Sequence, residues 1–170
     1  MRVKQLSVQN FRNIEKAVLK PADGVNVIFG ENAQGKTNLL ESIWLFTGCK
    51  SFRCRRDREM VGFDKPFAKN ELLFFAKGRE QNACLYIDKK RTAMKNGVTL
   101  RSPAELIGDF YAVIFAPAHL SLVKEGPIFR RRVLDTALCQ LIPHYAKGLT
   151  RHHHTLAQPQ PLLTDIHTTT

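Results

Sequence analysis

Eight consecutive residues carry the clearest chemistry in this chain. The run Gly30-Glu31-Asn32-Ala33-Gln34-Gly35-Lys36-Thr37 matches the pattern G-x-x-x-x-G-K-[ST] at every fixed position. Glycines let a backbone wrap closely around phosphate oxygens with its N–H groups pointing inward. Lys36 can then reach the β- and γ-phosphates, and the Thr37 hydroxyl can ligate a bridging Mg²⁺ ion. The run therefore predicts a phosphate loop for a nucleoside triphosphate; the alternative is a glycine-rich turn that binds no ligand.

The sequence on either side of this run fits a phosphate loop. Residues 25–29 form a short apolar run rich in β-branched side chains, which predicts a buried strand. From Thr37 the apolar residues recur at helical spacing, which predicts a mostly buried helix with Gly48 as its C-cap. The positive end of that helix would face the same phosphates.

The remaining elements are read from hydrophobic period and turn chemistry. We expect an opening strand near residues 3–8 with a hairpin partner at 17–19, and further strands at 68–76, 83–87 and 111–115. Asn96-Gly97 predicts a type I′ turn in a hairpin over residues 92–100. A capping box over residues 102–105 predicts a short helix to about residue 107, and Pro127 and Pro143 predict the starts of two later helices.

Hydrolysis would need a second acidic residue at the end of an apolar strand, to hold the metal or orient water. Asp88 is the nearest candidate, because it follows the apolar run 83–87. Lys89-Lys90-Arg91 comes directly after it, which is typical of a hairpin turn rather than a metal site. We therefore expect the catalytic carboxylate to be absent from this chain.

The composition favours a folded protein with an anionic partner. Of 170 residues, 26 are Lys or Arg and 15 are Asp or Glu, so the net charge is +11, and 44% are hydrophobic. This excludes collagen-like and fully disordered chains, and it points to nucleic acid, nucleotide phosphates or an anionic membrane surface. The sequence has no apolar run long enough for a spanning helix and no signal peptide after Met1. The four cysteines lack metal-ligand spacing, so we expect reduced thiols in a cytoplasmic protein.

Four arginines follow the first predicted helix: Arg53, Arg55, Arg56 and Arg58. They could line a DNA track, in which case binding would weaken steeply with added salt. The alternative is a solvated loop that offsets nearby acids. The sequence shows no base-reading motif, so any DNA binding should depend on shape and backbone.

Several stretches resemble the RecF family of bacterial DNA replication and repair proteins, which belong to the SMC/ABC-type ATPases. The resemblance runs from residue 1 to roughly residue 157, and the last stretch makes it specific. The stretches are Asn10-Phe11-Arg12-Asn13, residues 30–41, Lys50-Ser51-Phe52-Arg53, Phe115-Ala116-Pro117, and residues 122–135 with Arg130-Arg131-Arg132-Val133-Leu134-Asp135.

This resemblance implies an ATP-dependent DNA-binding protein that acts at single-stranded or gapped duplex DNA and in the SOS response. It implies recombinase loading with the mediator proteins RecO and RecR, and an ATP-driven homodimer. By its place in the family's Asn-Phe-Arg segment, Arg12 is expected near the bound phosphates, and Arg53 is a weaker candidate for the same neighbourhood.

The chain also departs from the family. The family is roughly twice this length, and its second half carries the signature motif and the acidic Walker B pair, which are absent here. Residues 158–161 read Gln-Pro-Gln-Pro, and two prolines would stop the helix that the family has there. We therefore expect a truncated or frameshifted reading frame, little hydrolysis, and an uncovered apolar sheet edge that lowers stability and promotes aggregation.

The predicted fold is α/β: a P-loop NTPase sheet of ABC-ATPase type with an antiparallel β-subdomain, followed by the start of a helical lobe. Residues 1–118 would form the ATP-binding lobe, 119–157 the start of the second lobe, and 158–170 an irregular tail. A RecF-like repair module is the function we expect. The rivals are a nucleic-acid-binding fragment with a non-functional phosphate loop and a P-loop kinase for small molecules.

Overall fold

The computed structural model describes residues 1–115 and 127–157 of the chain. The chain divides into two compact units, Met1–Phe115 and Ala116–Thr170. The predicted irregular tail, residues 158–170, and the predicted lobe boundary at residues 118–119 lie outside the described residues. Within the described ranges, none of the helices combines the length and apolar character needed to cross a bilayer.

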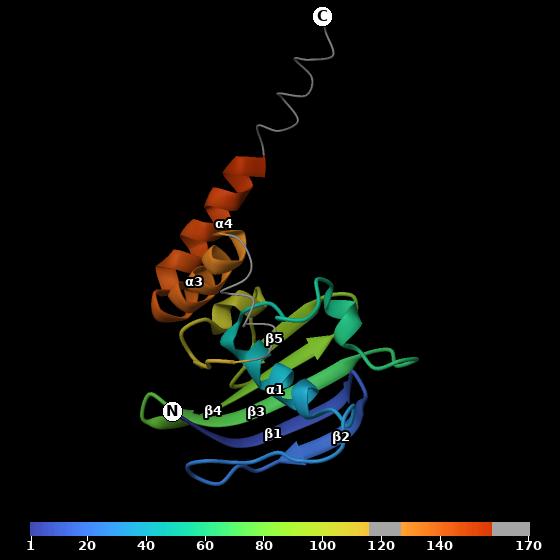
Figure 1. Ribbon diagram of the computed structural model, residues 1–170. Helices are drawn as coiled ribbons and strands as arrows, with labels where there is room; N and C mark the ends of the chain where they lie inside the picture. Colours follow the sequence, from blue (N-terminus) through green and yellow to red (C-terminus); the bar gives the residue numbers. More distant parts are fainter. Residues whose placement is uncertain (116–126, 158–170) are drawn as a thin grey trace, which may run out of the picture. The chain divides into compact units, whose positions relative to one another are not determined.

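The first unit is built on one antiparallel sheet of six strands in the order β2-β1-β3-β4-β5-β6 (Figure 1). Its strands are β1 (Arg2–Phe11), β2 (Ile14–Leu19), β3 (Ala68–Ala76), β4 (Arg79–Ile87), β5 (Arg91–Lys95) and β6 (Val98–Thr99). Its helical elements are α1 (Lys36–Trp44) and the 3₁₀ turns η1 (Leu45–Thr47), η2 (Asp57–Met60) and η3 (Pro103–Leu106). The predicted antiparallel subdomain is therefore present.

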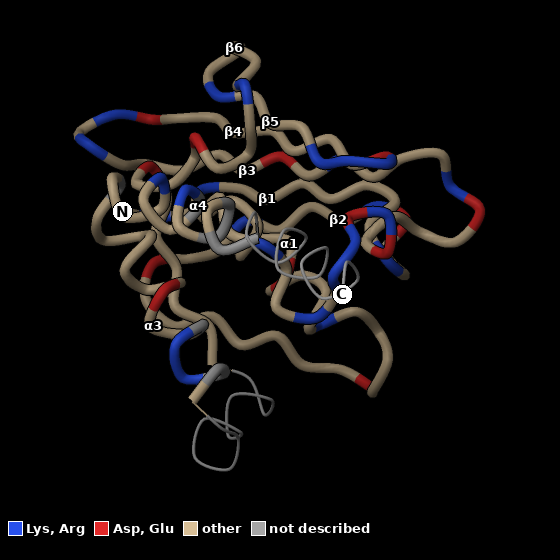
Figure 2. Tube along the Cα trace, turned by 90° about the horizontal axis from the view of Figure 1, so that it is seen from above, with Lys and Arg blue, Asp and Glu red and all other residues tan. Residues whose placement is uncertain are grey.

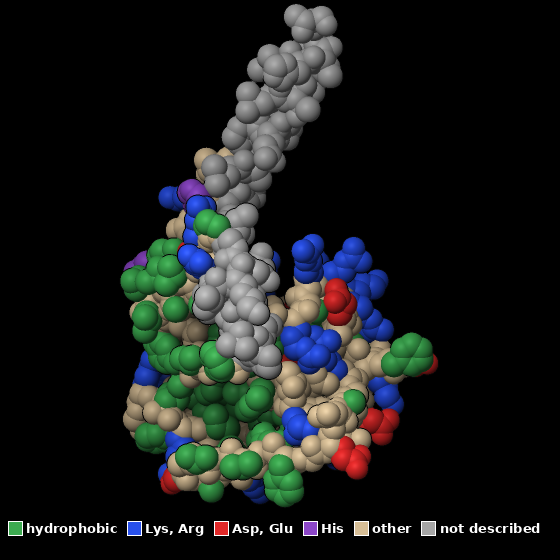
Figure 3. Space-filling view, in the orientation of Figure 1, with side chains coloured by type: hydrophobic (Ala, Val, Ile, Leu, Met, Phe, Trp, Pro, Cys, Tyr) green, Lys and Arg blue, Asp and Glu red, His purple; other side chains and the backbone are tan. Residues whose placement is uncertain are grey.

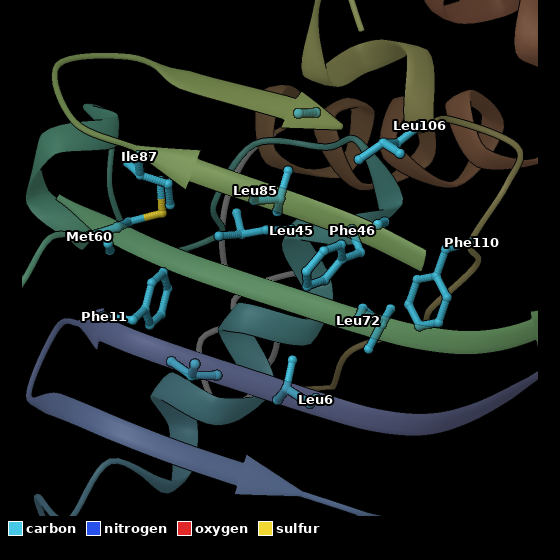
Figure 4. Close-up of a cluster of buried hydrophobic side chains, with 14 of the residues drawn as sticks. Leu6, Phe11, Leu45, Phe46, Met60, Leu72, Leu85, Ile87, Leu106 and Phe110 are labelled. Atoms are coloured by element: carbon cyan, nitrogen blue, oxygen red, sulfur yellow. The ribbon is translucent and has the colours of Figure 1, made fainter. Parts of the chain in front are cut away.

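One face of the sheet carries the core, and α1 with η1 lies against it (Figures 1 and 4). Along β3 the buried residues alternate with less buried ones, as expected for a strand with one covered face. The same face receives Leu45 and Phe46 from η1, both fully buried. Further fully buried members are Leu6, Phe11, Met60, Leu72, Leu85 and Ile87. This packing fixes the start of α1, and with it the phosphate loop, relative to the sheet.

The predicted turn and helix-end residues are confirmed, with one exception. Asn96 and Gly97 both have positive φ, 48° and 80°, which is the backbone of a type I′ turn between β5 and β6. Gly48 ends η1 with a φ of +80°. The predicted capping box at Ser102 is wrong: its side chain makes no capping hydrogen bond, and Pro103 starts only a 3₁₀ turn.

Two predicted strands do not form. Residues 25–29 and 111–115 run outside any strand or helix, and most of their large apolar side chains are exposed, whereas Ile28, Ala112 and Ile114 are half-buried. The exposed fraction is 90% for Val25 and Phe29, and 99% for Val113. A strand exists only when a neighbour accepts its hydrogen bonds, and none of the strands among the described residues pairs with these two segments.

The second unit contains α3 (Pro127–Leu141) and α4 (Pro143–Ala157), which start at the two predicted prolines. The Tyr145 hydroxyl donates to Asp135 at 2.6 Å and ties one helix to the other. Leu134 and Leu141 of α3 are 62% and 70% exposed.

Candidate phosphate-binding site

The phosphate loop, residues 30–37, connects the extended segment 25–29 to α1. Gly30 and Gly35 have φ values of +146° and +95°, a region that favours glycine, and Ala33 also lies at positive φ. Gly35 caps the start of α1, and its carbonyl accepts the Leu39 N–H at 2.9 Å. The first turn of α1 carries no acidic side chain, so nothing there opposes an anion at the helix N-terminus.

The Lys36 ammonium reaches back across this loop. Its Nζ atom donates to the carbonyl oxygens of Gly30 at 2.7 Å and Glu31 at 2.5 Å. The loop backbone therefore folds around the Lys36 ammonium group. Thr37 is exposed, so its hydroxyl is open to a metal ion that arrives with a nucleotide. This arrangement fits a triphosphate, since the loop amides, one ammonium and one hydroxyl surround the same turn.

The β1–β2 turn braces the phosphate loop from the side. Asn13 donates from Nδ2 to the Ala33 carbonyl oxygen at 2.6 Å, and its Oδ1 accepts from Asn38 at 2.7 Å. The approach is close: a Cβ atom on Gly35 would lie 2.9 Å from Asn13 Oδ1. Glycine at position 35 is therefore required by space as well as by φ.

A charged cluster lies one turn further along α1. Arg12 donates from Nε and Nη2 to the two carboxylate oxygens of Glu41, at 2.5 and 2.8 Å, and from Nη1 to the Glu59 carbonyl at 3.3 Å. The hydrogen bond to Glu41 raises the pKa of the Arg12 guanidinium, although burial opposes this rise. Ser51 Oγ also donates to Glu41, at 2.5 Å, and Arg53 Nη1 lies 3.6 Å from its Oε2.

The four predicted DNA-contacting arginines do not behave as one group. Arg53 donates to Asn38 Oδ1 at 2.5 Å, so it belongs to the cluster beside the phosphate loop. Arg55 and Arg56 are exposed, in the loop before η2. Arg58 donates to the carbonyls of Lys65 and Pro66, each at 3.0 Å. Asp57 and Glu59 lie among these arginines in the sequence, and Figure 2 shows basic and acidic positions in several of the loops around the sheet.

Asp88 lies in the turn between β4 and β5, and its Oδ1 accepts the Lys90 N–H at 3.0 Å, as expected for a hairpin turn. In the described residues, no group of three or more His, Cys, Asp or Glu side chains could hold a metal ion. All four cysteines are free thiols.

Comparison with known proteins supplies the family. Residues 1–110 match the family described as AAA ATPase domain, which is more than half of the chain. The chain belongs to the AAA ATPase domain family. Within this domain the glycine-rich run lies between the segment at residues 25–29 and α1, the helix that covers the sheet and begins at Lys36.

Curated relatives extend the match beyond the AAA ATPase domain. The chain is 40% identical over 173 residues to the DNA replication and repair protein RecF of Clostridioides difficile strain 630, covering 98% of this chain and 45% of that protein. It is 37% identical over 175 residues to RecF of Caldanaerobacter subterraneus subsp. tengcongensis, covering 98% and 46%. The chain thus spans less than half the length of these relatives, and the resemblance to RecF is confirmed.

Solved structures confirm the fold class. A RecF structure described as a recombination mediator protein with ATP, in the RecFOR pathway, superposes with a TM-score of 0.90 at 36% identity, covering 97% of this chain and 45% of that chain. The SMC head domain of Thermotoga maritima superposes with a TM-score of 0.53 at 24% identity, covering 65% and 43%, which supports the fold alone. The AAA ATPase domain here thus has the P-loop NTPase fold.

Sequence patterns pointed to the phosphate loop and Arg12 but not to the side chains that link them. Glu41, Asn13, Asn38 and Ser51 were not among the predicted site residues. All four lie inside the stretches that carry the resemblance, residues 10–13, 30–41 and 50–53. Their position inside these stretches is the one sequence feature that points to them as site residues. Their mutual contacts depend on three segments that only the fold of the AAA ATPase domain brings together.

Proposed function

We propose that this chain binds ATP with Mg²⁺ and serves as the nucleotide-binding part of a DNA replication and repair protein of RecF type. The observation that carries the proposal is the glycine-rich loop at the N-terminus of α1, with positive φ at Gly30 and Gly35, no acidic side chain in the first turn and the β1–β2 turn at its side. The AAA ATPase domain match and the RecF relatives support it. The RecF structure that superposes with a TM-score of 0.90 is described as RecF with ATP.

Each residue of the loop has a distinct part in this proposal. The amides of Gly30, Glu31, Asn32, Ala33, Gln34 and Gly35 would surround the phosphate oxygens. Lys36 would exchange the two loop carbonyls for phosphate oxygens, because an anion is a stronger partner for an ammonium than a carbonyl is. Thr37 would ligate Mg²⁺, and Arg12 would lie near the phosphates.

Titration calorimetry with ATP, with and without Mg²⁺, tests the proposal. We expect saturable binding that weakens without Mg²⁺. Lys36→Ala should weaken it about 10- to 100-fold, because a charged hydrogen bond contributes about 1.5–3 kcal/mol and 1.4 kcal/mol is a factor of ten. Lys16→Ala, which removes the same charge from exposed β2, is the matched control and should bind like the unaltered chain.

The main rival is a nucleic-acid-binding fragment whose phosphate loop stays empty. The contacts of Lys36 with the loop's own carbonyls are the observation that favours it. In that case the unaltered chain would give no ATP binding heat, and Lys36→Ala would behave identically. Such a result would reject the ATP-binding proposal and leave the basic surface as the functional feature.

We further propose DNA as the partner of the basic surface. Lys and Arg side chains gather at the upper right of the molecule in Figure 3. Arg55 and Arg56 are exposed and would contact backbone phosphates, together with Arg58. For the whole protein, the proposal includes binding to gapped or single-stranded DNA and interaction with RecO and RecR. It also includes a homodimer, a part in the SOS response and a cytoplasmic location. Efficient hydrolysis is not expected of residues 1–170, since no catalytic carboxylate is recognised in the sequence.

A further inference from the structure

Glu41 is a fully buried acid beside the phosphate loop. Its side chain has no exposed surface, and it lies on α1 four residues after Thr37. A buried carboxylate costs free energy unless charged or polar partners satisfy it. Here Arg12, Ser51 and Arg53 approach its two oxygens from two other segments of the chain.

The side chains of the two arginines are partly exposed to solvent, whereas the side chain of Glu41 is not. The Arg12 side chain is 18% exposed and that of Arg53 is 42% exposed, whereas that of Glu41 is 0% exposed. An anion approaching this side of the loop therefore meets guanidinium groups, while the acid lies behind them. The Glu41 carboxylate pairs with both guanidinium groups, and its own oxygen atoms are not accessible to the anion.

The same two arginine-bearing segments contact the loop through asparagines. Asn13, next to Arg12 in the chain, bonds to Ala33, and Arg53 bonds to Asn38, which in turn bonds to Asn13. Glu41 is therefore connected, through Arg53 and through the chain neighbour of Arg12, to the asparagines that contact the phosphate loop and α1. Fixing these long side chains beforehand removes an entropy cost that binding would otherwise include.

We propose that Glu41 is a positioning residue that presents Arg12 and Arg53 to the phosphates of the bound nucleotide. This proposal rests on the proposed ATP binding. Glu41 acts through the arginines and does not itself touch the ligand. An opposite expectation comes from charge alone: removing a negative charge near an anion site should tighten anion binding.

The test is the Glu41→Gln variant, measured by ATP titration calorimetry with Mg²⁺. The glutamine amide would present a donor to a guanidinium that needs an acceptor, so Arg12 loses its two-point anchor. We expect ATP affinity to fall about 10-fold. Glu59→Gln, which removes the same charge nearby while leaving the Glu59 carbonyl that accepts from Arg12, should not lower ATP affinity.

A double-variant cycle separates positioning from general damage to the fold. In a chain that already carries Arg12→Ala and Arg53→Ala, Glu41→Gln should no longer change ATP affinity, because the groups it positions are gone. Equal weakening in both backgrounds would overturn the proposal, as would unchanged or tighter binding by Glu41→Gln alone. If the unaltered chain binds no ATP, the proposed function itself has failed, which is a different outcome.

Measurement on the unaltered chain covers the case in which Glu41→Gln does not fold. With ¹⁵N-labelled arginine, the Arg12 Nε–H signal should exchange slowly with water both before and after ATP is added, because the Glu41 contact persists. A signal that exchanges rapidly once ATP is bound would show that the contact breaks, and the proposal would be wrong.

Discussion

Single side chains hold the end of the first unit against the sheet, and Asp109 is the clearest case. Its carboxylate accepts from Lys77 at 3.0 Å and lies 2.5 Å from Lys95 Nζ. Burial raises the pKa of Asp109, but the contacts with Lys95 and Lys77 outweigh burial, so its pKa lies below its ordinary value of 3.8. These contacts connect the segment after η3 to β5 and to the β3–β4 turn.

This shift predicts how stability responds to acid. Above pH 3.8 the carboxylate is ionised in the folded and unfolded chains alike, so its contribution is fully present. As the pH falls below that value the unfolded chain takes up the proton first, and the contribution is lost. Asp109→Asn should lower the free energy of unfolding by about 1–2 kcal/mol at pH 7, and the difference should shrink as the pH falls below 3.8.

Urea unfolding at several pH values checks this expectation. Glu105→Gln, which removes an exposed acid from η3, is the control and should follow the unaltered chain at every pH. A difference for Asp109→Asn that stays constant down to pH 2 would contradict the assigned ion pairs.

Residue types alone were enough to find the loop, because glycine, lysine and threonine at fixed spacing are rare outside phosphate sites. They could not reveal Glu41, since an acid on an apolar helix has no special spacing of its own. Its role depends on Arg12, 29 positions earlier, and on Ser51, 10 positions later. Sequence patterns report neighbours along the chain, and this cluster is made of neighbours in space.

Among the elements, the turn that ends η1 is the most tightly constrained. Gly48 has a φ of +80°, and a Cβ atom there would lie 2.7 Å from Ile107 Cγ1 and 3.0 Å from the Ile107 nitrogen. Backbone atoms cannot move aside as a side-chain tip can. The end of the helix therefore packs directly on the segment that follows η3.

Gly48→Ala should lower the free energy of unfolding by about 2–5 kcal/mol, because the left-handed backbone costs about 1–2 kcal/mol and crowding adds about 1–3 kcal/mol. Gly78→Ala is the matched control: its φ is +76°, but nothing lies within 4 Å of the added Cβ atom. It should show only the smaller, conformational cost. Urea unfolding followed by circular dichroism measures both, and equal costs would contradict the close approach seen at Gly48.

Element prediction succeeded where the partners were local. The hairpins β1–β2, β3–β4 and β5–β6 form between strands adjacent in the chain, so alternation and turn residues identify them. Residues 25–29 and 111–115 have equally strong strand patterns, yet neither segment forms a strand of the described sheet. An apolar run predicts burial, but burial needs a neighbour, and the pattern carries no information about whether that neighbour is present.

At the scale of the whole molecule, two apolar segments that form no strand, residues 25–29 and 111–115, expose large side chains. Val27 is 78% exposed and Phe115 is 79% exposed, and neither segment belongs to the sheet formed by the described residues. Exposed apolar side chains promote association between chains. The chain also spans less than half the length of its curated relatives.

We therefore expect the 170-residue chain to form concentration-dependent aggregates and to bind the dye ANS. The double variant Val27→Lys with Val113→Lys should reduce the light scattering severalfold, since charge on an exposed edge opposes pairing. Phe63→Lys with Phe75→Lys, at two exposed aromatic residues that lie away from the edge strands, is the control and should have a smaller effect. A chain that stays monodisperse at high concentration would contradict this view.

The order in which the sheet draws its strands has a consequence for synthesis. All six strands come from residues 2–99, and every pairing joins strands adjacent in the chain except that of β1 with β3, which ends at residue 76. The sheet therefore needs no strand from α3, α4 or the residues after them. Synthesis from the N-terminus thus supplies the whole sheet, together with residues 30–37 that lie beside it, before the C-terminal end of the chain is made.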